Sequence, residues 1–307
     1  NIEYVKWDYN RHISDMYSQS LENQGEFYHR YILGLYEVLN RVFNQLHPEI
    51  LFESCSSGGN RFDLGMLCYS PQIWTSDDTD PIERLDIQGG IFNFYPLSTV
   101  SAHVSMSPNA QTLRATPLST RFNVACFGVL GYELDFADLT PDELKQIKEQ
   151  VEFYKAHRRT FQYGKFEFVP VDNPNQLSWQ VERDGEIIAG LFQKKTSAFP
   201  YRDRLSVPCA DPNKEYSVEG VKQYLRIKTF GPLFNHILPV RLKSDGLIIR
   251  TVDKNYSLTD GHEIYTCYGD ALNFGINLEM QYEGTGYNEN IRLLGDFGSN
   301  LYLIKEI

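Results

Sequence analysis

Two patterns of hydrophobic and polar residues divide the 307-residue chain near residue 165. Before that point, short apolar runs of strand length alternate with longer stretches in which apolar residues recur every three or four positions, the period of an amphipathic helix. The predicted strands are 2–8, 50–55, 72–77, 91–96 and 122–128, and the longest predicted helix covers 24–46. Beyond residue 165, short runs separated by turn residues predict strands instead of helices.

Capping residues indicate where the predicted helices begin and end. Asn23 with Glu26 predicts a capping box before the first helix, and His47-Pro48 ends that helix. Asp80 followed by Pro81 predicts a second start, because Asp is a preferred N-cap and Pro suits the first helical position. Thr140-Pro141-Asp142-Glu143 predicts a third.

Strand–helix alternation with polar residues at strand ends is typical of a (β/α)8 TIM barrel. Such a barrel has eight strands, and five are predicted here, so the other strands are expected upstream of Asn1. We therefore predict that 1–164 is a partial catalytic barrel and that 165–307 is a C-terminal antiparallel β-sandwich. No low-complexity linker separates the two parts, so we expect them to pack closely. The predicted strands of the second part are Lys165–Pro170, Ser178–Glu182, Ile187–Gln193, Glu215–Val218, Tyr224–Lys228, Glu263–Tyr268 and Leu301–Lys305.

Composition narrows the function classes. The net charge of −11 argues against nucleic acid as a partner, because no basic face is available to neutralise phosphates. The five cysteines are scattered, without a CxxC pair, which argues against a metal site and favours a reduced, cytoplasmic protein. No apolar run is long enough to predict a membrane span.

Two strand ends carry the candidate chemistry. Lys6-Trp7-Asp8 closes the first predicted strand, and Trp74-Thr75-Ser76-Asp77-Asp78-Thr79-Asp80 closes the third. A pair of carboxylates is the catalytic requirement of glycoside hydrolysis, and in retaining enzymes their carboxyl groups lie roughly 5–5.5 Å apart. Lys6, two residues before Asp8, adds a positive charge on the same face of the strand. The sequence therefore predicts a sugar-cleaving site with Asp8 and Asp77.

These residues, together with Phe52-Glu53-Ser54-Cys55-Ser56-Ser57-Gly58-Gly59-Asn60-Arg61-Phe62-Asp63, resemble the α-galactosidases of glycoside hydrolase family 36, in the bacterial type with a Cys-x-x-Gly loop. The resemblance implies that Asp8 is the nucleophile, Asp77 the acid/base, and Lys6 a ligand of the galactose hydroxyls. It also implies that Cys55 and Gly58 line the sugar, and Trp74 is taken as a further sugar contact. The family's usual Cys-x-Gly-Gly-Gly loop is altered here, because Ser57 and Asn60 replace glycines.

Simpler explanations exist for several residues. A salt bridge with Lys6 could explain Asp8, the N-cap explains Asp80, and an extended backbone would turn Asp78 away from the site. A lone His among apolar residues, such as His103, is more often part of the core. Trp7 and Trp74 are equally well explained by packing.

The resemblance implies hydrolysis of terminal α-galactosides, such as raffinose and melibiose, by double displacement without a cofactor, in a homo-oligomer that is often a tetramer in the family. One alternative is α-galactosyl transfer or hydrolysis of α-N-acetylgalactosaminides, which the loop from Cys55 to Asn60 would help to decide. Another is an inactive fragment or sugar-binding remnant, if the isolated chain lacks the remaining barrel strands.

Overall fold

The computed structural model describes residues 2–10, 13–198, 202–236, 239–259, 263–282 and 291–307. Its first part contains a five-stranded sheet in which every neighbouring pair is parallel and the strands follow chain order. The strands are β1 (Tyr4–Asp8), β2 (Leu51–Cys55), β3 (Gln72–Trp74), β4 (Val100–Ser105) and β5 (Val129–Glu133). Parallel strands in chain order bring all five carboxyl ends to one edge of the sheet.

A helix follows each strand. These are α1 (Phe27–Leu39) with its extension η2 (Asn40–Leu46), α2 (Leu64–Leu67), α3 (Pro81–Phe92), α4 (Leu118–Ala125) and α5 (Pro141–Tyr163). The predicted starts of α3 and α5 are confirmed: Asp80 accepts a hydrogen bond from the Ile82 amide, and Thr140 forms a capping box with Glu143. The box predicted at Asn23 is wrong, because the Asn23 side chain accepts from the Gly25 amide instead.

Three strand predictions need correction. Residues 91–92 end α3, and 122–125 lie in α4, so the fourth and fifth strands are β4 and β5. Both misassigned runs are short and apolar, and periodicity alone cannot distinguish a buried helix from a buried strand at that length. The third strand is shorter than predicted and ends at Trp74, which places Asp77 in the loop that follows it.

The second part is built on a six-stranded antiparallel sheet of order β13-β10-β15-β8-β7-β6. All seven predicted strands are present: β6 (Lys165–Val169), β7 (Gln176–Arg183), β8 (Glu186–Gln193), β10 (Glu215–Gly220), β11 (Tyr224–Arg226), β13 (Ile264–Tyr268) and β15 (Ser299–Glu306). Two small pairs add β9 (Arg204–Leu205) with β14 (Ile276–Asn277) and β11 with β12 (Ser257–Thr259). The remaining helices are α6 (Leu247–Asn255), α7 (Gly269–Phe274) and the short η1 (Gln24–Glu26), η3 (Leu97–Thr99), η4 (Phe136–Asp138) and η5 (Ile227–His236).

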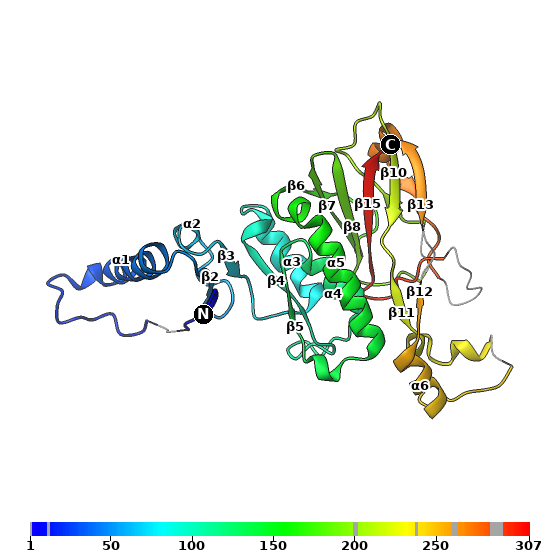
Figure 1. Cartoon of the computed structure of the whole chain (residues 1–307), viewed down its shortest axis with the longest axis horizontal. Helices are drawn as coiled ribbons and strands as arrows, with labels where there is room; N and C mark the ends of the chain where they lie inside the picture. Colours follow the sequence, from blue (N-terminus) through cyan, green and yellow to red (C-terminus); the bar gives the residue numbers. More distant parts are fainter. Residues whose placement is uncertain (1, 11–12, 199–201, 237–238, 260–262, 283–290) are drawn as a thin grey trace.

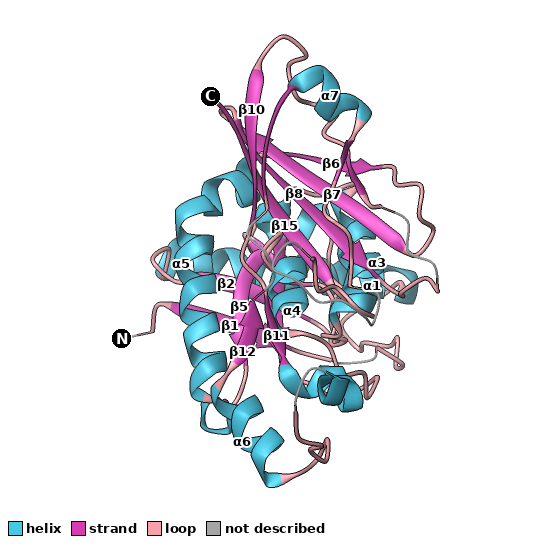
Figure 2. Ribbon diagram, turned by 90° about the vertical axis from the view of Figure 1, so that its right-hand side faces the viewer, coloured by secondary structure: helices cyan, strands magenta, loops and turns pink. Residues whose placement is uncertain are grey.

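The two parts share one hydrophobic core. Helices α3, α4 and α5 lie between the parallel strands and the antiparallel sheet, while β1, β2 and α1 extend to the opposite end of the molecule (Figure 1). Trp179 of β7 is 1% exposed and packs 5.4 Å from Phe127 and 4.9 Å from Phe192, measured between ring centroids. Figure 2 shows the long α5 beside this sheet. The expected close packing of the two parts is therefore present.

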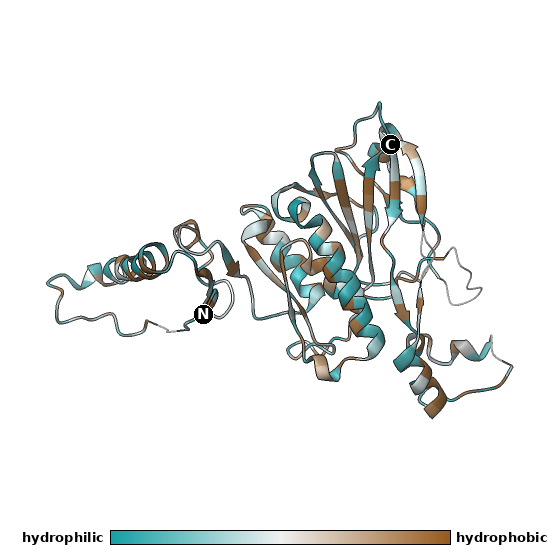
Figure 3. Cartoon of the chain, viewed as in Figure 1, coloured by the Kyte–Doolittle hydropathy of each residue, from teal (hydrophilic) through white to brown (hydrophobic). Residues whose placement is uncertain are grey.

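One peripheral segment is apolar at its surface. Hydrophobic residues gather on α6, at the lower right of Figure 3, where the side chains of Leu247 and Ile248 are 77% and 59% exposed. Among the helices of the described residues, none is both long enough and apolar enough to cross a membrane.

Candidate active site

The carboxyl ends of β1, β2 and β3 bring most of the predicted site residues together. Asp8 is the last residue of β1 and is in register with Cys55, the last residue of β2. Lys6 and Asp8 share one face of β1, and Trp7 points to the other. There the Trp7 ring packs 4.6 Å from the ring of Tyr9, so packing accounts for Trp7.

Lys6 interacts electrostatically with both candidate carboxylates. Its Nζ is 3.3 Å from Oε1 of Glu53 and 4.1 Å from the centroid of the Trp74 ring. Burial lowers the pKa of Lys6, and the negative charges of Glu133, Asp77 and Asp8 partly oppose that shift. The ammonium is therefore within electrostatic reach of both Asp8 and Asp77, and its direct ion pair is with Glu53.

Glu53 is a site residue that the sequence did not single out. Its side chain is 1% exposed and accepts hydrogen bonds from Tyr4 Oη and, at 2.9 Å, from Gln72 Nε2. Burial raises the pKa of Glu53. A charged residue inside an otherwise buried strand was the available signal, because such a residue is rarely buried without a partner. The ion pair with Glu53 positions the Lys6 ammonium.

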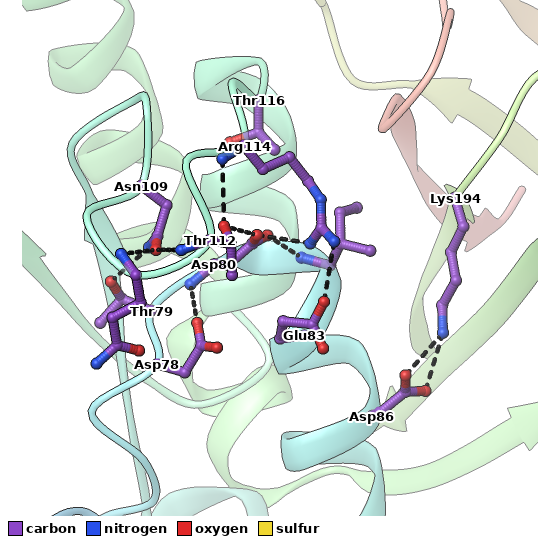
Figure 4. A network of polar contacts seen from close by, with 12 residues as sticks. Asp78, Thr79, Asp80, Glu83, Asp86, Asn109, Thr112, Arg114, Thr116 and Lys194 are labelled. Atoms are coloured by element: carbon purple, nitrogen blue, oxygen red, sulfur yellow. Dashed lines mark hydrogen bonds and ion pairs between the residues drawn. The ribbon is translucent and has the colours of Figure 1, made fainter.

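The three aspartates after β3 have different surroundings. Asp80 is fully buried, caps α3 and binds Arg114 and Thr112, while the Asp78 carboxylate accepts from the Asp80 amide (Figure 4). Asp77 is exposed, and its Oδ1 accepts a hydrogen bond of 3.0 Å from Trp74 Nε1. Asp78 and Asp80 thus hold the loop and the helix start, and Asp77 is the member of the run that a substrate can reach.

The Trp74 ring is covered by protein. It is 4% exposed, and the Lys6 ammonium, the Arg84 guanidinium and the His103 ring lie 4.1, 4.4 and 4.4 Å from its centroid. The structure therefore assigns Trp74 a contact through its N–H to Asp77 rather than an open ring face.

The loop after β2 fits tightly against the loop that carries Asp77. Gly58 has φ +79°, a left-handed conformation, and a Cβ built on it would lie 2.6 Å from Ser76 Cα. Only glycine fits both constraints. On the other side, the Ser57 amide donates to Asn10 Oδ1 at 2.7 Å. The loops after β1, β2 and β3 are therefore interlocked.

Cys55 lies at the base of this loop. Its side chain is 2% exposed, and burial raises the pKa of its thiol, with the nearby Asp8 charge acting in the same direction. A thiol with a raised pKa stays protonated at neutral pH and offers a neutral S–H beside Asp8.

His103 does not belong to the apolar core, contrary to the preferred explanation from sequence. It lies on β4 between Trp74 and Gly131, where a Cβ on Gly131 would approach His103 Cδ2 to 2.5 Å. Its Nδ1 is 3.4 Å from Glu133, and burial lowers the pKa of His103. The sequence predicts the fourth strand at 91–96 and therefore does not place His103 on a strand of the sheet, whereas the structure places it on β4.

The chemistry of its side chains identifies this site, and not a cavity. Cavities of about 590 and 220 Å³ lie elsewhere and share no residue with the cluster around Lys6. The buried carboxylate of the larger one, Asp203, is already bound by Arg292, Gln176 and Gln281. No group of three or more His, Cys, Asp or Glu side chains suited to a metal ion occurs among the residues that the structure describes.

Comparisons with known proteins agree with the sequence resemblance. The Melibiase family model matches residues 1–164. The α-galactosidase Mel36A of Lactobacillus acidophilus is 44% identical over 219 residues, which cover 70% of this chain and 30% of that protein. AgaA of Geobacillus stearothermophilus is 45% identical over 228 residues, or 73% of this chain and 31% of that protein.

Solved structures are similar along the whole chain. An α-galactosidase from Lactobacillus brevis superposes with a TM-score of 0.77 and 37% identity, over 99% of this chain and 36% of its own. The family 36 α-galactosidase AgaA from Geobacillus stearothermophilus in complex with raffinose gives a TM-score of 0.76 and 35% identity, over 100% of this chain and 36% of its own. The chain thus spans about a third of the length of these relatives. It belongs to the Melibiase family, within glycoside hydrolase family 36.

Proposed function

We propose that this chain supplies the catalytic carboxylates of a retaining α-galactosidase, with Asp8 as nucleophile and Asp77 as acid/base. The observation that carries the proposal is the placement of both exposed carboxylates at one strand-end edge, within electrostatic reach of Lys6. Asp8 attacks the anomeric carbon while Asp77 gives its proton to the leaving oxygen. Asp77 then takes a proton from water, which displaces Asp8 from the sugar.

The surrounding residues have supporting roles in this proposal. Lys6 donates hydrogen bonds to galactose hydroxyls, and Glu53 holds its ammonium in place. Cys55 and Gly58 line the sugar, and Gly58 also lets its loop approach the backbone of Ser76 and Asp77 closely. Trp74 acts through Asp77, and a direct sugar contact by its ring remains a prediction.

The proposed substrates are terminal α-galactosides of the raffinose and melibiose type. Relatives with 35% identity have been solved in complex with raffinose and with stachyose. The five-stranded parallel sheet of residues 1–164 fits part of a (β/α)8 barrel, and residues 165–307 fit a C-terminal β-sandwich domain. The oligomeric state and the cytoplasmic location remain predictions.

The test is the stereochemistry of the first product. Proton NMR of melibiose hydrolysis by the protein that carries this chain should show α-galactose before mutarotation produces the β-anomer. An initial β-anomer would exclude double displacement and the role given to Asp8.

A further inference from the structure

Arg84 holds the loop that carries Asp77. It lies in α3, its side chain is almost completely buried, and its Nε donates to the Asp78 carbonyl at 2.6 Å. Its two terminal nitrogens donate to Thr75 Oγ1 and to the Ser76 carbonyl. One guanidinium therefore binds residues on both sides of Asp77.

A second connection runs through Trp74. The guanidinium carbon of Arg84 lies 4.4 Å from the centroid of the Trp74 ring, and the indole Nε1 donates to Asp77 Oδ1 at 3.0 Å. A cation over the face of a ring is attracted to that face and so favours this placement of the ring. The direction of the N–H that binds Asp77 thus depends on Arg84.

The positive charge of Arg84 has no ion-pair partner among the described residues, because its hydrogen bonds go to two carbonyls and a hydroxyl. Burial lowers the pKa of Arg84 to about 10, although the negative charges of Asp78, Glu133 and Asp77 partly oppose that shift, so it still carries its charge at neutral pH. A buried charge without a direct ion pair is costly, and hydrogen bonds from a neutral side chain could hold a loop without that cost. A fixed cation beside the loop also favours the carboxylate that remains after a proton donor has reacted.

We propose that Arg84 is the positioning residue of the acid/base: it orients Asp77 through the loop backbone and through Trp74. This inference rests on the proposed function, since it assumes that Asp77 is the proton donor. A misplaced proton donor matters most when the leaving group is poor, because protonation then supplies much of the assistance to bond cleavage.

The experiment compares Arg84→Lys with a matched control in the protein that carries this chain. Arg121 lies in the next helix, α4, is 7% exposed, donates to the Ser105 carbonyl and likewise has a pKa lowered by burial to about 10. Arg121→Lys therefore changes a similarly buried guanidinium whose hydrogen bond goes to Ser105 and not to the loop 75–78. For each variant, kcat/KM is measured on melibiose and on 4-nitrophenyl α-galactoside.

For Arg84→Lys, we expect the loss of kcat/KM on melibiose to exceed the loss of kcat/KM on the aryl substrate by about tenfold. This is smaller than the effect expected when a general acid is removed altogether. Arg121→Lys should lose equally on both. Thr75→Val, which removes one acceptor of Arg84, should show a smaller loss in the same direction and serves if Arg84→Lys does not fold. Equal losses on both substrates for Arg84→Lys, or for Thr75→Val in its place, would overturn the positioning role.

Asp77→Ala is measured in parallel to separate the two hypotheses. If Asp77→Ala discriminates between the substrates and Arg84→Lys does not, only the role of Arg84 fails. If Asp77→Ala does not discriminate, the assignment of the acid/base fails, and the role of Arg84 fails with it.

Discussion

Replacing Gly58 by Ala tests whether the interlocked loops set the position of Asp77. Gly58 has φ +79°, and the added Cβ would lie 2.6 Å from Ser76 Cα and 3.1 Å from the Asp77 amide nitrogen. Both neighbours are backbone atoms, so a rotamer change cannot relieve the contact. The loop that carries Asp77 must move.

The structure gives the expected loss of stability and the expected loss of activity in Gly58→Ala. An L-residue in the left-handed conformation costs about 1–2 kcal/mol. Ordinary carbon–carbon contact begins at about 3.5 Å, so Ser76 must move by about 1 Å. Misplacement of a catalytic group by about 1 Å can cost on the order of 100-fold in rate. Gly58→Ala should therefore lower the free energy of unfolding by at least about 1–2 kcal/mol and kcat/KM by about 100-fold.

Gly185 provides the matched control. It has φ +84° in the turn between β7 and β8, and a Cβ there would meet no atom within 4 Å. Gly185→Ala should lose about 1–2 kcal/mol in urea unfolding, because it carries the same conformational cost without the contact with Ser76, and it should keep its kcat/KM. If Gly58→Ala kept the activity of Gly185→Ala, the argument that Gly58 positions Asp77 would be refuted.

Four further substitutions test the roles of the aspartates. Asp8→Ala should abolish turnover, and azide should restore part of it by forming a β-galactosyl azide detectable by NMR; near-normal turnover without azide would exclude Asp8 as nucleophile. Asp77→Ala should lose far more kcat/KM on melibiose than on 4-nitrophenyl α-galactoside, and a preference of this kind in Asp78→Ala instead would move the role to Asp78. Asp80→Ala should lower the free energy of unfolding by more than the value for a lost N-cap, which is about 1 kcal/mol, because Asp80 also binds Arg114. Any loss of kcat/KM should be equal on both substrates. An unchanged free energy of unfolding in urea would contradict this role.

The sequence predicted the starts of α3 and α5 correctly because the capping hydrogen bonds themselves are local. Asp80 and Thr140 cap α3 and α5 through the amides two and three residues along, so a short sequence window contains the whole interaction. The strand predictions for 91–96 and 122–128 were wrong because tertiary packing decides the structure of these runs. Phe92 and Phe122 are buried on helices that lie between two sheets.

The candidate site divides in the same way. Asp8 and Asp77 could be found because each follows an apolar run ending beside a Trp, in a motif that the family resemblance also marks. The roles of Glu53, Arg84 and His103 could not be predicted, because they depend on contacts across neighbouring strands and on the helix after β3. The spacing of residues along one chain segment carries no information about such contacts.

The antiparallel sheet supports the site through α3, the helix that supplies both Arg84 and the Asp80 cap. Lys194, just after β8, binds the Asp86 carboxylate on α3 with hydrogen bonds of 3.0 and 2.8 Å, as Figure 4 shows. That ion pair is exposed and contributes little by itself. The larger contribution comes from Trp179, which is 1% exposed and packs 5.5 Å from Phe92 at the other end of the helix. Because α3 is held against the sheet at Asp86, Gly89 and Phe92, the position of Arg84 and of the loop that it binds depends on residues far from Asp77 in sequence.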